Sequence, residues 1–131
     1  MTERDVRTIG ILGAGQLGRM LALAGIPLGY GFRFLDPGDG ESVVGLGELV
    51  TGDYLDDHAI ARFAEGCDRI TFEFENVPAS VVGALAENYD VAPSRRALEA
   101  SQDRWTEKQF FASLGIATAP TRAVDSLADL E

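Results

Sequence analysis

The chain has 131 residues, enough for one domain with a hydrophobic core and too few for two full ones. Its 46% apolar and 24% charged residues are typical of a globular protein, and its net charge of −10 argues against nucleic acid or an anionic membrane as a partner. One cysteine and one histidine exclude a disulfide framework and a His/Cys zinc cluster. The sequence shows neither a signal-peptide core nor a run of transmembrane length, so we expect a cytoplasmic protein.

The first third of the chain predicts a strand, a turn, a helix and a second strand. Residues 8–12 form an apolar run of the kind that parallel sheets bury on both faces. Residues 31–36 form the second strand, and residues 37–40 form a turn. Between the strands, apolar residues recur at helical spacing and define one face of a helix: Leu17, Met20, Leu21, Ala24 and Leu28.

The remaining elements continue this alternation of strands and helices. Residues 38–52 are the least regular, because Gly45 and Gly47 weaken a helix; we expect a loop with a brief strand at 48–51. Further helices are expected after Asp56 or Asp57, after Pro78, at 95–100 and at 101–114, with strands at 69–74 and 91–92, an extended segment at 119–124, and a helix from Leu127. The alternation predicts an α/β fold, a Rossmann-like parallel sheet flanked by helices. Because the last unit begins near the final residue, we expect a longer protein.

The turn from Gly13 to Gly18 carries the first candidate site. Gly13 permits a tight turn, Gly15 lets backbone approach a ligand, and Gly18 allows a helix to pack closely on a strand. The N-terminus of the following helix adds N–H donors and partial positive charge. The alternative is a tight strand-to-helix connection without a ligand.

Two carboxylates are expected at the same edge of the sheet. Asp36 follows Gly18 by 18 residues, a spacing that suits a ribose hydroxyl and favours NAD; alternatively it begins the Pro37 turn. Glu73 lies near the carboxyl end of its strand, where it can accept a hydrogen bond from a ligand amine or hydroxyl. The alternative for Glu73 is a solvated strand end or a helix cap.

A cationic helix face is the last candidate. Arg104 and Lys108 are four residues apart on the helix predicted to include Gln102 and Asp103, which suits a phosphate or a purine nucleotide; a solvated face is the alternative. Tyr54 could line the pocket, His58 is expected on a helix surface, Cys67 as a small packed hydrophobe and Trp105 in a core or interface.

Together, these segments resemble the N-terminal part of the 5-(carboxyamino)imidazole ribonucleotide synthetases, which belong to the ATP-grasp superfamily. The strings Gln16-Leu17-Gly18-Arg19-Met20 and Phe72-Glu73-Phe74-Glu75-Asn76-Val77-Pro78 carry most of the resemblance. Further matches are Phe34-Leu35-Asp36-Pro37, Asp53-Tyr54, Pro93-Ser94, Gln102-Asp103-Arg104, Glu107-Lys108 and Gly115 to Pro120. The resemblance is weak over residues 38–52, and Ala14 stands where the family often has glycine.

The resemblance implies a pre-ATP-grasp domain at residues 1–100 and the start of an ATP-grasp domain at 101–131. It implies an ATP-dependent carboxylase of purine biosynthesis that converts 5-aminoimidazole ribonucleotide and bicarbonate to the carbamate, as a homodimer that needs ATP and magnesium. Gly15, Gln16, Leu17, Asp36 and Glu73 would bind the ribonucleotide, and Arg104 would contact ATP. No catalytic residue or metal ligand is expected within these 131 residues, so the chain alone is expected to be inactive.

Two other functions stay open. An NAD-binding domain of an oxidoreductase agrees with Asp36 but not with the Phe-Glu-Phe-Glu-Asn string. A non-catalytic assembly module would dimerise or dock without binding a small molecule.

Overall fold

The computed structural model describes residues 7–130. The chain divides into two compact units, one that ends at Arg95 and one that begins at Arg96. The predicted division into domains 1–100 and 101–131 stays a prediction.

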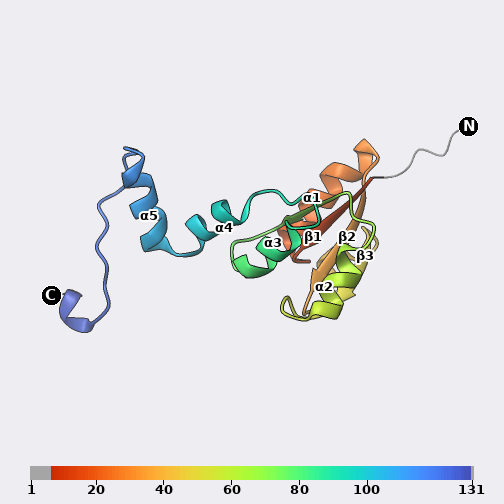
Figure 1. Cartoon of the computed structure of the whole chain (residues 1–131), viewed down its shortest axis with the longest axis horizontal. Helices are drawn as coiled ribbons and strands as arrows, with labels where there is room; N and C mark the ends of the chain where they lie inside the picture. Colours follow the sequence, from red (N-terminus) through yellow and green to blue (C-terminus); the bar gives the residue numbers. More distant parts are fainter. Residues whose placement is uncertain (1–6, 131) are drawn as a thin grey trace, which may run out of the picture. The chain divides into compact units, whose positions relative to one another are not determined.

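The first unit is built on a four-stranded parallel sheet (Figure 1). Its strands are β1 (Thr8–Leu12), β2 (Gly31–Asp36), β3 (Glu48–Thr51) and β4 (Arg69–Phe72), in the order β3-β2-β1-β4. The helices are α1 (Gln16–Gly25), α2 (Asp57–Ala64) and α3 (Ala79–Leu85), with short 3₁₀ helices η1 (Ile26–Leu28) and η2 (Glu41–Val43). The predicted α/β fold is therefore confirmed, and the expected edge strand at 91–92 is a single parallel bridge between Ile70 and Val91.

The strand order places the topological switch point of the sheet between β1 and β4. The chain moves from β1 outward to β3 and then returns to pair β4 with the other side of β1. Leu12 and Phe72 are partners in register at the carboxyl ends of these two strands. The residues that follow them, the glycine turn and Glu73, consequently emerge side by side where ligands of open α/β sheets bind.

The two faces of the sheet carry different layers of the core. One face packs Ile11, Phe32 and Phe34 against Ala22 of α1 and Val43 of η2. On the other face the fully buried Phe63 of α2 approaches Gly10 so closely that an added Cβ would lie 2.8 Å from its ring. A side chain at position 10 would therefore separate α2 from the sheet.

The apolar face predicted for α1 does not face the core. All five of its residues are exposed: Leu17, Met20, Leu21, Ala24 and Leu28. Leu17 is 54% exposed and Met20 is 64% exposed. The small residues Gly18, Ala22 and Gly25 pack toward the sheet instead, because the rings of Phe32 and Phe34 fill the space there; an added Cβ at Gly25 would overlap the Phe32 ring.

The irregular segment 38–52 is more ordered than a loop. It contains η2 and β3, Val43 is almost fully buried, and the predicted strand at 48–51 is confirmed. Gly47 passes against the Phe32 carbonyl, which leaves no room for a side chain. Gly47 therefore allows close contact with β2, whereas Gly45 has φ +78° and no neighbour within 4 Å of an added Cβ.

The second unit contains helices separated at Asp103. They are α5 (Arg104–Ser113), the 3₁₀ helix η3 (Leu127–Leu130), and α4 (Arg95–Gln102), whose first residue ends the first unit. The prediction of one continuous helix over 101–114 is wrong, because the Asp103 side chain accepts from Thr106 N at 2.7 Å and begins a new helix there.

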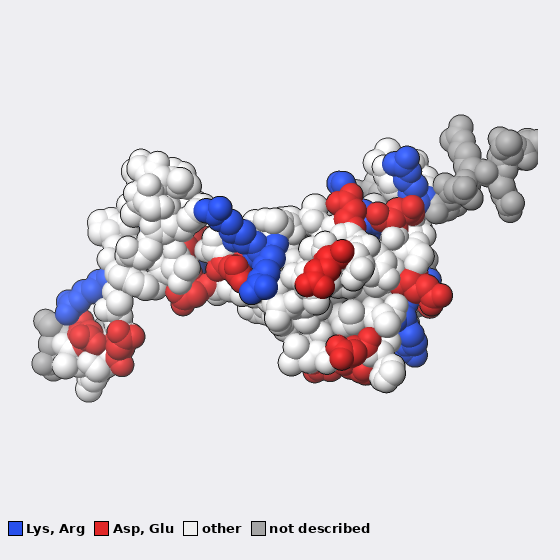
Figure 2. Space-filling view, in the orientation of Figure 1, with Lys and Arg blue, Asp and Glu red and all other residues white. Residues whose placement is uncertain are grey.

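Figure 2 shows how charged side chains are distributed over one face of the molecule. On the face shown in Figure 2, acidic side chains of the first unit occur in several separate places with uncharged areas between them. Within residues 7–130, no helix is both long and apolar enough to span a membrane.

Candidate functional site

The glycine turn connects β1 to α1 through backbone that favours glycine. Gly13 has φ +108°, in the left-handed region, and its N–H donates to the Leu35 carbonyl at 2.8 Å. Gly15 is the N-cap of α1 and has no side chain with which to cap it. The exposed donors of this helix start must therefore bond to groups from elsewhere in the fold.

Glu73 supplies those acceptors. Its Oε1 accepts from Gly15 N at 2.9 Å, and its Oε2 accepts from Gly15 N at 3.1 Å and from Gly18 N at 2.5 Å. The strand predicted over 69–74 ends at Phe72, but Glu73 N still donates to the Leu12 carbonyl at 3.1 Å. That backbone bond holds Glu73 at the end of β1, with its carboxylate over the turn.

Asp36 bonds to the same turn from the end of β2. Its Oδ2 accepts from Ala14 N at 2.9 Å, and its Oδ1 accepts from Gly38 N at 2.7 Å. The second bond confirms the alternative that Asp36 begins the Pro37 turn. The first bond shows that it also reaches the glycine turn, so its carboxylate joins the two loops.

Tyr54 completes this cluster. Its hydroxyl donates to Asp36 Oδ2 at 3.4 Å. Burial raises the pKa of Tyr54 above its usual range, and the negative charges of Asp36 and Glu73 raise it further. The phenol therefore stays protonated and remains a donor beside two carboxylates.

The predicted ribonucleotide-site residues divide into two groups. Gly15, Asp36 and Glu73 converge on the turn, whereas Gln16 and Leu17 are exposed at its rim. Gln16 Nε2 donates to Ser42 Oγ at 3.4 Å, and Arg19 donates to the Ser42 carbonyl at 2.9 Å. Ser42 is a neighbour that sequence reasoning missed, since it lies in the irregular segment.

This cluster is suited to ligand groups that donate hydrogen bonds. A carboxylate offers about four lone-pair positions, and the N–H groups of Gly15 and Gly18 use about three of those on Glu73. The remaining acceptor capacity can receive an amine or a hydroxyl. The NAD alternative loses support, because Glu73 occupies the N–H groups that would receive a pyrophosphate.

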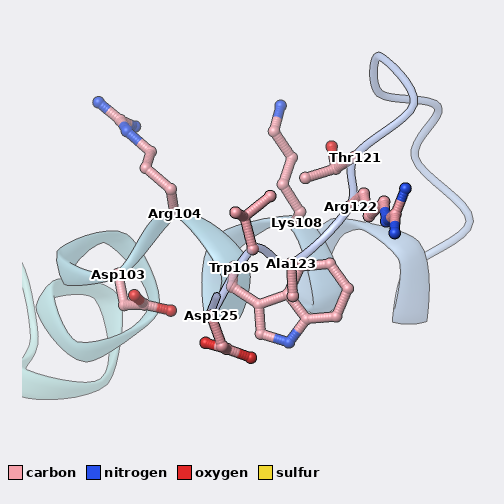
Figure 3. A pocket seen from close by; sticks show the side chains of 9 residues that line it. Asp103, Arg104, Trp105, Lys108, Thr121, Arg122, Ala123 and Asp125 are labelled. Atoms are coloured by element: carbon pink, nitrogen blue, oxygen red, sulfur yellow. The ribbon is translucent and has the colours of Figure 1, made fainter. Parts of the chain in front are cut away.

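A second candidate site lies within the second unit. It is a pocket of about 460 Å³ whose lining residues come from α5, its N-cap and the segment before η3 (Figure 3): Asp103, Arg104, Trp105, Lys108, Thr121, Arg122, Ala123, Val124 and Asp125. Arg104 and Lys108 extend in the same direction from α5, which confirms their predicted shared face. Three cationic side chains line this pocket beside the two carboxylates of Asp103 and Asp125, and the cations can attract phosphate groups.

Several expectations for this pocket need correction. Gln102 ends α4 and Asp103 caps α5, so they do not share one helix with Arg104. Trp105 is 43% exposed and lines the pocket, so within the described part of its unit it is not a core residue. Arg104 pairs with Glu107 at 2.9 Å, and Arg122 is a lining residue that sequence reasoning did not identify.

His58 and Cys67 lie on or beside α2. His58 is exposed on α2, as predicted, and Asp56 is confirmed as the cap of that helix. Cys67 packs beside Gly10 and its thiol donates to the Phe63 carbonyl at 3.2 Å. Burial raises the pKa of the Cys67 thiol. Within the part of the chain that the structure describes, no group of three or more His, Cys, Asp or Glu residues could hold a metal ion.

Comparison with known proteins places this geometry in a family. An N5-carboxyaminoimidazole ribonucleotide synthase of Pseudomonas aeruginosa is 47% identical over 123 residues, covering 94% of this chain and 34% of the relative. The synthetase structure from Thermus thermophilus superposes with TM-score 0.83 at 54% identity, over 93% of this chain and 34% of that one. An Aspergillus clavatus synthase in complex with ADP and 5-aminoimidazole ribonucleotide gives TM-score 0.80 at 28% identity, over 96% and 35% of the two chains.

The chain spans about a third of the length of these relatives. Residues 6–102 match the ribonucleotide synthetase preATP-grasp domain, which covers the whole sheet, the glycine turn and Glu73. The parallel sheet and the strings around the glycine turn and Glu73 agree with this match. The chain belongs to the ribonucleotide synthetase preATP-grasp domain family.

Proposed function

We propose that this chain is the N-terminal, ribonucleotide-binding part of an ATP-dependent carboxylase. The proposed reaction joins bicarbonate to the exocyclic amine of 5-aminoimidazole ribonucleotide, with ATP converted to ADP and phosphate. The observation that carries the proposal is the convergence of Asp36 and Glu73 on the glycine turn in a chain whose relatives are synthetases of this reaction. The contribution of the first unit is to bind and orient the amine.

In this proposal the ribonucleotide lies over the carboxyl ends of β1 and β4. Glu73 and Asp36 accept from its amine or ribose hydroxyls, while Gly15 leaves room for the Glu73 carboxylate beside the ligand. Gln16 and Leu17, both exposed, border the site. The Aspergillus relative, which is complexed with the same ribonucleotide, supports this choice of ligand.

We assign ATP to the second unit. Arg104, Lys108 and Arg122 line one pocket, and their charges fit a polyphosphate. ATP would supply the energy that activates bicarbonate. Magnesium is expected to accompany ATP, but residues 7–130 provide no cluster of ligands for it, so we derive no step through the metal.

The binding proposal is tested by amide NMR shifts of the 131-residue chain. Adding 5-aminoimidazole ribonucleotide should shift the amides of Gly15, Gln16 and Leu17, whereas ATP should shift those of Arg104 and Lys108. NAD should shift neither group. Micromolar binding of NAD, or no response of the turn at millimolar ribonucleotide, would contradict the proposal.

Catalysis is tested by joining this chain to the remaining two thirds of the Thermus thermophilus relative. The hybrid should form ADP only when the ribonucleotide and bicarbonate are present, whereas the 131-residue chain alone should be inactive. Glu73→Ala in the hybrid should lower kcat/KM at least about tenfold, equivalent to about 1.4 kcal/mol. Glu87→Ala removes an exposed carboxylate in the turn that follows α3 and should leave the rate unchanged.

The family resemblance also leads us to propose a cytoplasmic homodimer that binds neither nucleic acid nor membrane. Light scattering of the hybrid should give twice the monomer mass. A dimer of the 131-residue chain that binds neither ATP nor the ribonucleotide would instead support a non-catalytic assembly module.

A further inference from the structure

The three spaced glycines of the turn all meet one side chain. An added Cβ at Gly15 would lie 2.8 Å from Glu73 Oε1, and one at Gly18 would lie 2.8 Å from Oε2. An added Cβ at Gly13 would overlap the Glu73 side chain. In dinucleotide-binding folds this spacing admits a pyrophosphate, but here it admits a carboxylate of the same chain.

The carboxylate also takes the place of a phosphate electrostatically. It is anionic, presents two oxygens, and bonds to the N–H groups at the start of a ten-residue helix, where the helix dipole favours negative charge. Asp36 accepts from the neighbouring Ala14 N at 2.9 Å. A phosphate entering this turn would have to displace Glu73 and approach a second carboxylate.

We infer that Glu73 is a specificity-determining residue, a built-in substitute for phosphate that closes the glycine turn to phosphoanhydride ligands. The site at the ends of β1 and β4 consequently selects ligands by their amine and hydroxyl donors, and any ligand phosphate must bind to other groups. This inference rests on the geometry of the turn and does not depend on the proposed carboxylase activity.

Inorganic pyrophosphate is the probe that tests this role. Binding is measured by calorimetry, and its position by the amide NMR shifts of Gly15 and Gly18. Glu73→Ala should open the turn and bind pyrophosphate at least about tenfold more tightly than the unsubstituted chain. Glu73→Gln is neutral but fills the same space, so it should keep the turn closed to pyrophosphate. Glu87→Ala should bind pyrophosphate as the unsubstituted chain does.

Two results would overturn the inference. One is equal pyrophosphate binding by the unsubstituted chain and Glu73→Ala, and the other is binding that leaves the amides of Gly15 and Gly18 unchanged. If Glu73→Ala is unfolded, pyrophosphate that binds only the folded state must shift the equilibrium toward folding by mass action. Circular dichroism is therefore followed as pyrophosphate is added. Recovery of the helical signal supports the inference, and a chain that stays unfolded at the highest pyrophosphate concentration refutes it.

Discussion

Glu73 Oε2 accepts a hydrogen bond from Gly18 N at 2.5 Å, across 55 residues of chain. This bond joins the end of β4 to the first turn of α1, and an added Cβ at Gly18 would lie 2.8 Å from the same oxygen. Gly18 is therefore both the donor to the carboxylate and the residue whose missing side chain makes room for it.

Two glycine substitutions should change stability in opposite directions. Alanine is a better helix former than glycine by about 1 kcal/mol, so helix propensity alone favours Gly18→Ala and Gly83→Ala equally. Gly18→Ala should nevertheless destabilise by about 1–3 kcal/mol, because its Cβ meets a hydrogen-bonded carboxylate and the Gly13 carbonyl. An added Cβ at Gly83 meets the exposed side chain of Arg95, which can move aside, so Gly83→Ala should stabilise the chain. Urea unfolding followed by circular dichroism compares the two, and a stabilised Gly18→Ala would contradict the assigned packing.

Replacing the Glu73 carboxylate should cost stability even without any ligand. Glu73→Gln exchanges one acceptor oxygen for an N–H₂ group that faces backbone donors. The free energy of unfolding should therefore decrease by about 2 kcal/mol. The matched control Glu87→Gln changes an exposed residue, so its free energy of unfolding should stay within about 0.5 kcal/mol of that of the unsubstituted chain. Equal effects of the two substitutions in urea titrations would show that the turn does not depend on Glu73.

Tyr54 should make the first unit less stable at alkaline pH. Its pKa is raised in the folded state from the ordinary value of 10.0, so above pH 10 the unfolded chain loses this proton first. Below pH 10 the ionisation of Tyr54 does not lower the free energy of unfolding, and above pH 10 the free energy of unfolding decreases as the pH rises. Tyr54→Phe should therefore lose less stability than the unsubstituted chain between pH 8 and pH 11.

The control for this pH dependence is Tyr30→Phe, since Tyr30 is exposed. Urea midpoints for the three proteins at each pH give the comparison. Parallel curves for Tyr54→Phe and the unsubstituted chain would refute the raised pKa.

Cys67 should report the opening of the first unit. It is the only cysteine of the chain, its thiol is packed beside Gly10 and Phe63, and burial raises its pKa. Both effects lower the thiolate population available for alkylation. Mass spectrometry should find iodoacetamide labelling at pH 8 several-fold slower in the native chain than in urea. Equal rates would mean that Cys67 is freely accessible in the folded protein.

Much of this fold follows from local sequence. The apolar run at 8–12, the glycine turn and the strand ending at Asp36 are properties of neighbouring residues, and the alternation of strands with helices predicts a parallel sheet. Because parallel strands present their carboxyl ends at one edge, the sequence also predicts that Glu73 and the glycine turn lie at the same side of the sheet.

Only tertiary structure decided what these residues contact. Periodicity identifies an apolar face on α1, but the rings of Phe32 and Phe34 require small residues beneath the helix, so Gly18 and Ala22 face the sheet and Leu17 and Met20 do not. The partner of the glycine turn is likewise non-local. Its donors start a helix, its acceptor follows β4, and only the pairing of β1 with β4 brings the Glu73 carboxylate to them.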